Sequence, residues 1–294
     1  MEYDYSSKAP GHGCESPLLW GNGVRLPEFE HRRLLESTTD LLDYLDALHA
    51  YGAAIVKNTP AVDGAIIRFA EKIGIVRTVA FGIVHDVINN PHGCNVAHTA
   101  LELKPHSDLP SYSWPPSFQL LHYLDNTVTG GETVLVDGWK VLATLKSESP
   151  DDYDLLSRVS VPFKIFSNSD DTYAAEPIIQ RYPDGRPRVF RYSNQTAQPL
   201  RIHPDLMEPF YAAYRRLGRL IAEQRFRVTI RAEGGDMLTI HNHRVLHGRL
   251  AYDPYTGIRH LQDLYVEWDD VMAKRRVPRG HLPRQAWPAS SSPG

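Results

Sequence analysis

Two residues with metal-binding side chains, His106 and Asp108, are separated by a single residue in the sequence. Successive side chains of an extended strand alternate between two faces, so this spacing places the imidazole and the carboxylate on the same face. Two histidines and one carboxylate form the facial set that holds Fe(II) and leaves positions open for oxygen chemistry. The third ligand has to come from elsewhere in the chain, and His247 is the candidate. Alone, a His-x-Asp pattern is weak evidence, because such residues often serve only as hydrogen-bonding groups on a strand.

Two other histidines compete with His247 for the third ligand position. His241 and His243 lie close to it in the sequence and would share one face of an alternating strand. The residue types alone leave the choice open, and the preference for His247, from its Leu-His-Gly-Arg context and its spacing to Arg259, rests on the family resemblance described below. We therefore interpret His241 and His243 as structural residues.

A guanidinium and a hydroxyl accompany the metal-binding pattern. Arg259 follows His247 in the sequence and offers planar, bidentate hydrogen bonds to a carboxylate. Thr133, in a Gly-Gly-Glu-Thr segment, offers a hydroxyl that can bond the same carboxylate. Both residues suit a small carboxylic acid bound beside the metal.

Composition excludes several classes of protein. The chain has 294 residues, 42% of them hydrophobic and 23% charged, with a net charge of −3, so neither a nucleic-acid nor an anionic-membrane partner is expected. It shows no apolar run long enough for a membrane span and no signal-peptide pattern. Two cysteines are too few for a disulfide framework or a cysteine-based zinc or iron–sulfur site, which fits a cytoplasmic location.

The pattern of short segments predicts an α+β fold. A helix is expected from the Ser37 cap to Tyr51, and the longest amphipathic helix is expected over 206–224. Many short strands separate these helices, ending in a strand over 259–268, which is typical of a β-sandwich or jelly roll. We expect three parts: an N-terminal arm over 1–30, one domain over 31–278 and a flexible tail over 279–294.

Several segments together make the chain recognisable. It resembles the Fe(II)/2-oxoglutarate-dependent dioxygenases of the taurine dioxygenase superfamily and, within it, the gamma-butyrobetaine and trimethyllysine dioxygenase branch. The similar segments run in the family's order through nearly the whole catalytic region; they include His106-Ser-Asp-Leu-Pro, Gly130-Gly-Glu-Thr, Arg244-Val-Leu-His-Gly-Arg and Arg259-His-Leu with Tyr265 and Trp268-Asp269.

The resemblance implies a double-stranded β-helix with flanking helices, an α+β architecture. It implies Fe(II) on His106, Asp108 and His247, with O2 and 2-oxoglutarate as cosubstrates and the distal 2-oxoglutarate carboxylate on Arg259 and Thr133. The expected reaction is oxidation, by default hydroxylation, of an unactivated C–H bond in a small polar, acidic substrate, with release of succinate and CO2.

Departures from the branch concern the substrate. The branch encloses a trimethylammonium group in an aromatic cage, and this chain has Phe81, His85 and His98 at three cage positions and keeps a tyrosine only at Tyr265. Imidazoles are weak cage walls and repel a cation when protonated, which disfavours a quaternary ammonium substrate.

Two further positions bear on the substrate. Asn95 matches a position that contacts the substrate's acidic end, and a second such asparagine falls on Asn194 or on Ser193, depending on the alignment gap. All of these are expected substrate contacts.

Three competing hypotheses remain open at this point. The chain could be a betaine hydroxylase proper, a noncatalytic β-helix module with a structural metal, or a zinc hydrolase. We expect no counterpart of the branch's additional N-terminal zinc-binding module, because the arm is short and poor in cysteine. A homodimer contact through residues 265–277 is nevertheless an expectation.

Overall fold

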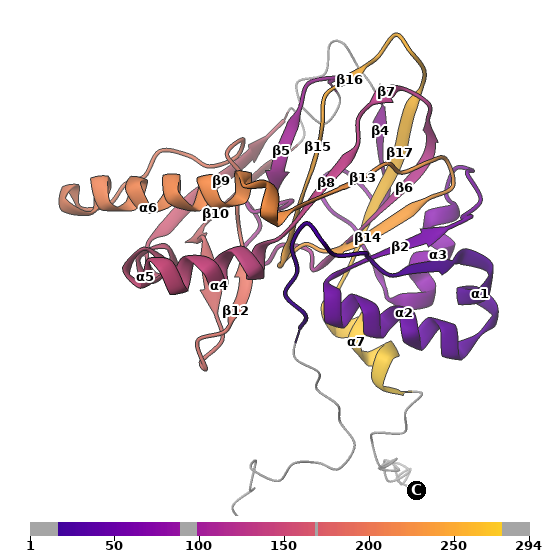
Figure 1. Cartoon of the computed structure of the whole chain (residues 1–294), viewed down its shortest axis with the longest axis horizontal. Helices are drawn as coiled ribbons and strands as arrows, with labels where there is room; N and C mark the ends of the chain where they lie inside the picture. Colours follow the sequence, from indigo (N-terminus) through magenta and orange to yellow (C-terminus); the bar gives the residue numbers. More distant parts are fainter. Residues whose placement is uncertain (1–16, 89–98, 168–169, 278–294) are drawn as a thin grey trace, which may run out of the picture.

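The computed structural model describes residues 17–88, 99–167 and 170–277 of the chain. Two β-sheets form its centre, and helices cover them from outside (Figure 1). The larger sheet has the strand order β1-β2-β14-β6-β17-β3, with β4 also paired to β17. Its strands are β1 (Glu28–Glu30), β2 (Ala53–Lys57), β3 (Val76–Arg77), β4 (His85–Ile88), β6 (Phe118–Asn126), β14 (Met237–His241) and β17 (Arg259–Val266).

The smaller sheet has the strand order β13-β8-β15-β5. Its strands are β5 (Leu103–His106), β8 (Thr133–Asp137), β13 (Arg227–Ile230) and β15 (Val245–Arg249). Apolar side chains of both sheets meet in one buried cluster, including Leu121 and Leu238 from the larger sheet and Leu135 and Val245 from the smaller one. The two sheets therefore pack face to face, as the predicted jelly roll requires.

Helices bury the outer surfaces in two separate clusters. One group packs against the larger sheet: α1 (His31–Glu36), α2 (Thr38–Tyr51), α3 (Ala65–Ile73) and α7 (Trp268–Arg276). The other group lies at the opposite end of the molecule: α4 (Gly138–Glu148), α5 (Pro150–Arg158) and α6 (Pro204–Ala222), followed by the 3-10 turn η2 (Gln224–Phe226). No helix of the described residues is long and apolar enough to cross a membrane.

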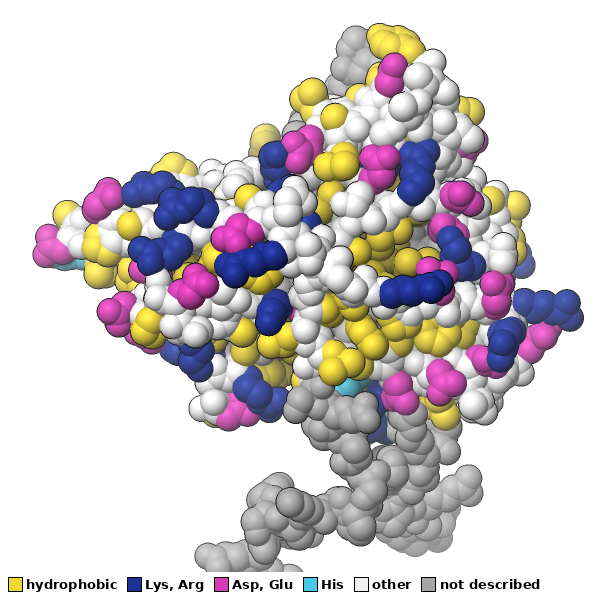
Figure 2. All heavy atoms as spheres, in the orientation of Figure 1, with side chains coloured by type: hydrophobic (Ala, Val, Ile, Leu, Met, Phe, Trp, Pro, Cys, Tyr) yellow, Lys and Arg dark blue, Asp and Glu magenta, His cyan; other side chains and the backbone are white. Residues whose placement is uncertain are grey.

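Three short strand pairs complete the architecture: β9 (Ser160–Phe166) with β10 (Asp171–Pro177), β11 (Ile179–Arg181) with β12 (Pro187–Phe190), and β7 (Thr129–Gly130) with β16 (Tyr252–Asp253). The β9–β10 hairpin was not expected, although its strands contribute Lys164 and Ile165 to the central cavity. Charged side chains of both signs are interspersed over the face shown in Figure 2.

Local signals in the sequence account for the helix boundaries. The Ser37 side chain accepts a hydrogen bond from the Asp40 backbone N–H, and Gly52 ends α2 in the left-handed region at φ 71°.

The terminal regions are described only in part. Residues 1–16 of the expected arm and the whole expected tail lie outside the described residues. Residues 17–30 pack against the domain, since Trp20 and Leu26 are buried and β1 pairs in parallel with β2. The division of the chain at residues 30 and 278 remains a prediction.

A buried ion pair connects this N-terminal segment to the sheets. Arg244 donates two hydrogen bonds to the Asp137 carboxylate, at 3.0 and 2.9 Å, and others to the carbonyls of Ala50 and Leu18. Asp137 also accepts from the backbone N–H of Trp20 and of Trp139, the latter at the start of α4. One carboxylate thus links β8, β15, α4 and the N-terminal segment.

We predict that Asp137→Ala strongly destabilises the fold. Because Arg244 would be left buried and unpaired, the free energy of unfolding should fall by about 3–5 kcal/mol in urea titrations. Glu36→Ala is the control: it breaks the exposed Arg32–Glu36 pair and should cost less than about 1 kcal/mol. Equal losses in the two variants would contradict this assignment.

Candidate metal centre and cosubstrate cavity

Antiparallel pairing of β5 with β15 sets His106 directly opposite His247. The two backbones approach closely beside this pair, because a Cβ on Gly248 would lie 2.5 Å from the Leu103 carbonyl oxygen and 2.8 Å from the Pro105 nitrogen. Only glycine is compatible with such an approach. The glycine that follows His247 therefore permits the pairing that joins the two histidines.

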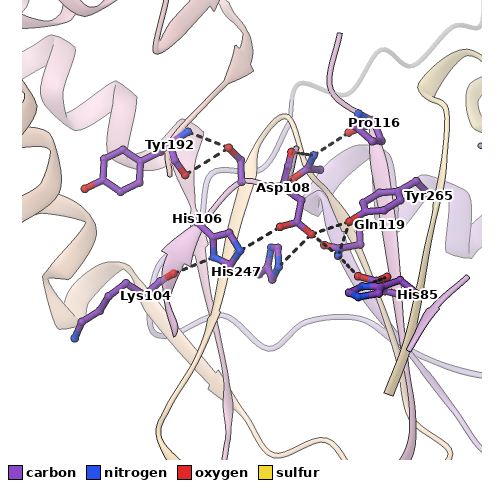
Figure 3. A network of polar contacts seen from close by, with 12 residues as sticks. His85, Lys104, His106, Asp108, Pro116, Gln119, Tyr192, His247 and Tyr265 are labelled. Carbon is purple, nitrogen blue, oxygen red and sulfur yellow. Dashed lines mark hydrogen bonds and ion pairs between the residues drawn. The ribbon is translucent and has the colours of Figure 1, made fainter. Parts of the chain in front are cut away.

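Asp108 lies just beyond the end of β5, and its side chain completes the cluster. One ligand atom from each of His106, Asp108 and His247 lies within 4.8 Å of the others. His106 Nε2 is 3.1 Å from Asp108 Oδ1, and His247 Nε2 is 3.8 Å from Asp108 Oδ2 (Figure 3). The strand was expected to continue through Asp108, but it ends at His106 and Leu109 adopts φ 51°.

Hydrogen bonds fix the orientation of these groups. His106 Nδ1 lies 3.0 Å from the Lys104 carbonyl oxygen. When Nδ1 carries the proton and donates it to this carbonyl, the lone pair of Nε2 is free to bind a metal. The Asp108 backbone is held from both sides by Asn242, whose amide accepts from its N–H at 2.8 Å and donates to its carbonyl at 3.0 Å. Asp108 Oδ2 accepts from Gln119 Nε2 at 2.6 Å and from the Tyr265 hydroxyl at 2.9 Å (Figure 3).

The protonation states suit a cation. Burial alone would raise the pKa of Asp108, but the imidazoles of His247 and His106 and the Tyr265 hydroxyl hold it well below its usual range. Burial lowers the pKa of His247 to about 4, so this imidazole is neutral at pH 7. A carboxylate and a neutral imidazole are the ligand forms that bind a metal. This donor set fits Fe(II).

A cavity of about 640 Å³ opens from this cluster between the two sheets. Its wall includes alternate residues of β17 (Arg259, Leu261, Asp263 and Tyr265) and of β6 (Gln119, Leu121 and Tyr123). Strand periodicity explains the alternation, because every second side chain points to the same face. Thr133, Phe81, His85 and Ser193 also line it.

Arg259 is a buried cation without a carboxylate partner among the described residues. It is only 6% exposed, its Nε has no hydrogen-bond partner within this part of the chain, and its guanidinium lies 5.7 Å from the ring centroids of Tyr123 and Tyr252. The Tyr123 hydroxyl lies 2.5 Å from Thr133 Oγ1, which brings a hydroxyl pair to the same region. A buried guanidinium needs an anion, so a carboxylate such as the distal group of 2-oxoglutarate fits here.

A second arginine, Arg249, belongs to the cavity wall. It is buried and donates to the carbonyls of Thr99 and Leu101. Burial and the nearby Arg259 charge lower its pKa to about 10. Main-chain carbonyls thus take up hydrogen-bonding capacity of this second guanidinium.

The structure places some of the expected substrate contacts in the cavity. Phe81, His85 and Tyr265 line the cavity, and Phe81 stacks on His85 at 4.9 Å. Asn95 and His98 lie outside the described residues.

Asn194 lies away from the central cavity. It is exposed, contacts the hydroxyls of Tyr192 and Tyr214, and lines a separate groove beside α6. Its alternative, Ser193, lines the central cavity, so the gap placement that favours Ser193 agrees with the structure.

The two competing histidines are away from the cavity. His241 stacks against Phe118 and Trp268, with centroids 4.9 and 4.7 Å apart, and His243 Nε2 lies 2.7 Å from the Pro115 carbonyl. Neither belongs to the metal-binding cluster or lines the cavity. Their surroundings are those of core residues.

Sequence reasoning missed three polar residues of the cavity: Gln119, Tyr123 and Asp263. The signal was present, since the period-two alternation that links Arg259 to Tyr265 passes through Asp263, and the same alternation on β6 links Gln119 to Tyr123. What the alternation does not give is which face of a fully buried strand points into the cavity.

Comparisons with known proteins identify the family of the chain. The sequence model of the "Taurine catabolism dioxygenase TauD, TfdA family" matches residues 21–265. A gamma-butyrobetaine dioxygenase from Pseudomonas sp. (strain AK-1) is 34% identical over 255 residues, covering 87% of this chain and 67% of the relative. The Homo sapiens gamma-butyrobetaine dioxygenase is 31% identical over 267 residues, covering 88% of this chain and 68% of the relative.

A solved structure shares the fold. The non-heme iron oxygenase OrfP, in complex with Fe and alpha-ketoglutaric acid, superposes with a TM-score of 0.60 at 18% identity, covering 84% of this chain and 86% of that one. The predicted double-stranded β-helix is thereby confirmed. With a family match over most of its length, the chain belongs to the TauD/TfdA dioxygenase family and is an Fe(II)- and 2-oxoglutarate-dependent oxygenase.

Proposed function

We propose that the chain hydroxylates an unactivated C–H bond of a small polar molecule, with succinate and CO2 as coproducts. His106, Asp108 and His247 hold Fe(II), and Arg259 with Thr133 binds the distal carboxylate of 2-oxoglutarate. One observation carries this assignment: the three-residue cluster and a buried guanidinium lacking a carboxylate partner among the described residues line the same cavity. A structural metal site would not need the guanidinium, which argues against a noncatalytic module.

The chain's residues position the reactants. When bound, Fe(II) and 2-oxoglutarate supply the oxidising power for C–H cleavage. Arg259 anchors the far end of the cosubstrate and thereby fixes the direction of its keto acid end. Gln119 and Tyr265 hold Asp108 Oδ2, which limits the rotation of this carboxylate. Apolar side chains such as Leu121 and Leu261 line the cavity beside these polar groups and make it less favourable for water.

The substrate differs from a trimethylammonium acid in this proposal. Three of the cage positions lie in the part of the chain that the structure describes. Phe81 and Tyr265 keep aromatic rings there, whereas His85 presents an imidazole beside Asp263. Betaine hydroxylation is the alternative, and it draws support from the relatives' activity. An acidic substrate, a homodimer through residues 265–277 and a cytoplasmic location remain predictions from the sequence.

The first functional prediction concerns the metal centre. Anaerobic addition of Fe(II) and 2-oxoglutarate should produce the visible charge-transfer band of a 2-oxo acid chelate, and His247→Ala should abolish it. His203→Ala is the matched control, because His203 is exposed at the start of α6 and should leave the band intact. A full band in His247→Ala would remove this residue from the ligand set.

The second prediction separates the two cavity arginines. Arg259→Gln should weaken 2-oxoglutarate binding by at least about 30-fold, because losing a buried charge partner costs about 2 kcal/mol or more. Arg249→Gln should weaken it much less, because Arg249 is occupied by main-chain carbonyls. Titration of the charge-transfer band with 2-oxoglutarate measures both values. The reverse order would reassign the anchor to Arg249.

The third prediction is a pH dependence of metal affinity. Burial opposes protonation of His106, but its hydrogen bond and ion pair with Asp108 dominate and raise its pKa above the ordinary value of 6.5. Because a metal binds only the deprotonated imidazole, affinity is full at high pH and falls as pH drops through this raised pKa. Calorimetric Co(II) titrations should show a loss approaching about tenfold per pH unit below that point. Constant affinity between pH 8 and pH 6 would argue against His106 as a ligand.

A further inference from the structure

A second carboxylate, Asp263, lies in the cavity close to the metal-binding cluster. Its side chain is on the inward row of β17 and only 5% of the residue is exposed. Asp263 Oδ2 accepts a hydrogen bond from Gln119 Nε2 at 2.9 Å, and the same nitrogen donates to Asp108 Oδ2 at 2.6 Å. A single amide nitrogen therefore bridges the two carboxylates.

No lysine or arginine of the described residues pairs with Asp263. Its Oδ1 has one basic neighbour, the Nδ1 of His85 at 3.4 Å; burial opposes protonation of this imidazole, but the contact with Asp263 raises the pKa of His85. Lys164, which also lines the cavity, pairs with Asp171 at 3.1 Å. Burial raises the pKa of Asp263 and the charge of Asp108 adds to this effect, although His85 and Gln119 oppose it. A buried carboxylate in this setting needs a cation.

The loaded centre does not provide that cation. Fe(II) offsets the Asp108 charge and one charge of 2-oxoglutarate, and Arg259 offsets the other. Arg249 also lines the cavity, but it lies near Arg259 and donates to main-chain carbonyls, and no ion pair joins it to Asp263. Among the described residues, the His85 imidazole is therefore the only basic group paired with Asp263, on the side of the cavity lined by Phe81 and Tyr265.

We propose that Asp263 binds a nitrogen cation of the substrate that carries N–H groups, a primary or secondary ammonium or a guanidinium. This inference rests on the proposed function and narrows its substrate class. The carboxylate oxygens accept charge-assisted hydrogen bonds from such a cation. A trimethylammonium group has no N–H donor and depends on aromatic faces. Next to Asp263 the wall presents the stacked rings of Phe81 and His85, and Tyr265 lies on the same row of β17 as Asp263. Asp263 thus takes the place of an aromatic cage.

A methylation series tests the proposal at constant carbon skeleton and charge. The probes are 4-aminobutanoate, its mono- and dimethylamino derivatives, and 4-(trimethylammonio)butanoate, with L-lysine and L-arginine as longer amines. Calorimetric binding is measured anaerobically to the enzyme loaded with Zn(II) and 2-oxoglutarate, so no turnover is needed. We expect affinity to fall as N–H groups are replaced by methyl groups, with at least tenfold between the first and last members. We also expect at least one amine to bind.

Asp263→Asn is the decisive variant, because it keeps shape and removes charge. It should weaken the preferred amine at least tenfold, whereas Asp263→Glu should retain the preference for N–H cations. Asp86→Asn, on β4 outside the cavity lining, is the matched control and should bind like the parent chain.

Three results would overturn the proposal: tightest binding of the trimethylammonium acid, binding of no amine, or unchanged amine affinity in Asp263→Asn. The last result would mean that His85 alone satisfies the carboxylate. Loss of the Fe(II)–2-oxoglutarate band in Asp263→Asn would make Asp263 a support of the metal site instead. If the parent chain itself forms no such band, the proposed function fails, which is distinguishable from failure of this inference.

Discussion

The site depends on the antiparallel register of β5 and β15. This register sets His106 opposite His247, and Asp108 follows where the chain leaves β5. A shift of the β5–β15 register by one residue would turn one imidazole to the other face of the sheet, and the three ligands would no longer lie together. Gly248 permits the close approach, and Asn242 holds the backbone of Asp108 through hydrogen bonds on both sides. Backbone pairing, more than any side-chain contact, therefore determines the metal-binding geometry.

A second strand, β17, organises the rest of the cavity. Arg259 and Tyr265 lie near its two ends, and the alternate side chains between them, Leu261 and Asp263, line the cavity. At about 3.3 Å per residue, the guanidinium and the phenol are separated by about 20 Å of strand, so one strand serves both ends of the cavity. Tyr265 has a double role: it lines the cavity and donates to Asp108. Asp263 lies beside it on the same row, linked to the metal-binding cluster through Gln119.

Much of this could be predicted from the sequence, because the informative signals are local. The spacing of His106 and Asp108, the cap at Ser37 and the glycine at 52 act within a few residues, and the longest helix was expected where α6 lies. The choice of His247 over His241 and His243 relied on the family pattern. In the structure those two histidines pack among Phe118, Trp268 and Pro115.

The remaining features depend on contacts between distant segments. No local pattern indicates that Arg249 bonds the carbonyls of Thr99 and Leu101, or that one amide of Gln119 reaches two carboxylates. Ser193 and Asn194 are neighbours in the sequence, yet Ser193 lines the central cavity and Asn194 lines the groove beside α6. The sequence alignment alone cannot decide which of the two lines the cavity. Tertiary packing decides these points.

A crystal structure of the anaerobic complex with Fe(II) and 2-oxoglutarate would show which residues hold the metal and the cosubstrate. An iron anomalous peak should lie within bonding distance of His106 Nε2, an Asp108 carboxylate oxygen and His247 Nε2, and the distal carboxylate of 2-oxoglutarate should meet Arg259. Iron bound at another group of residues, or a cosubstrate carboxylate on Arg249 with Arg259 left unpaired, would contradict the account.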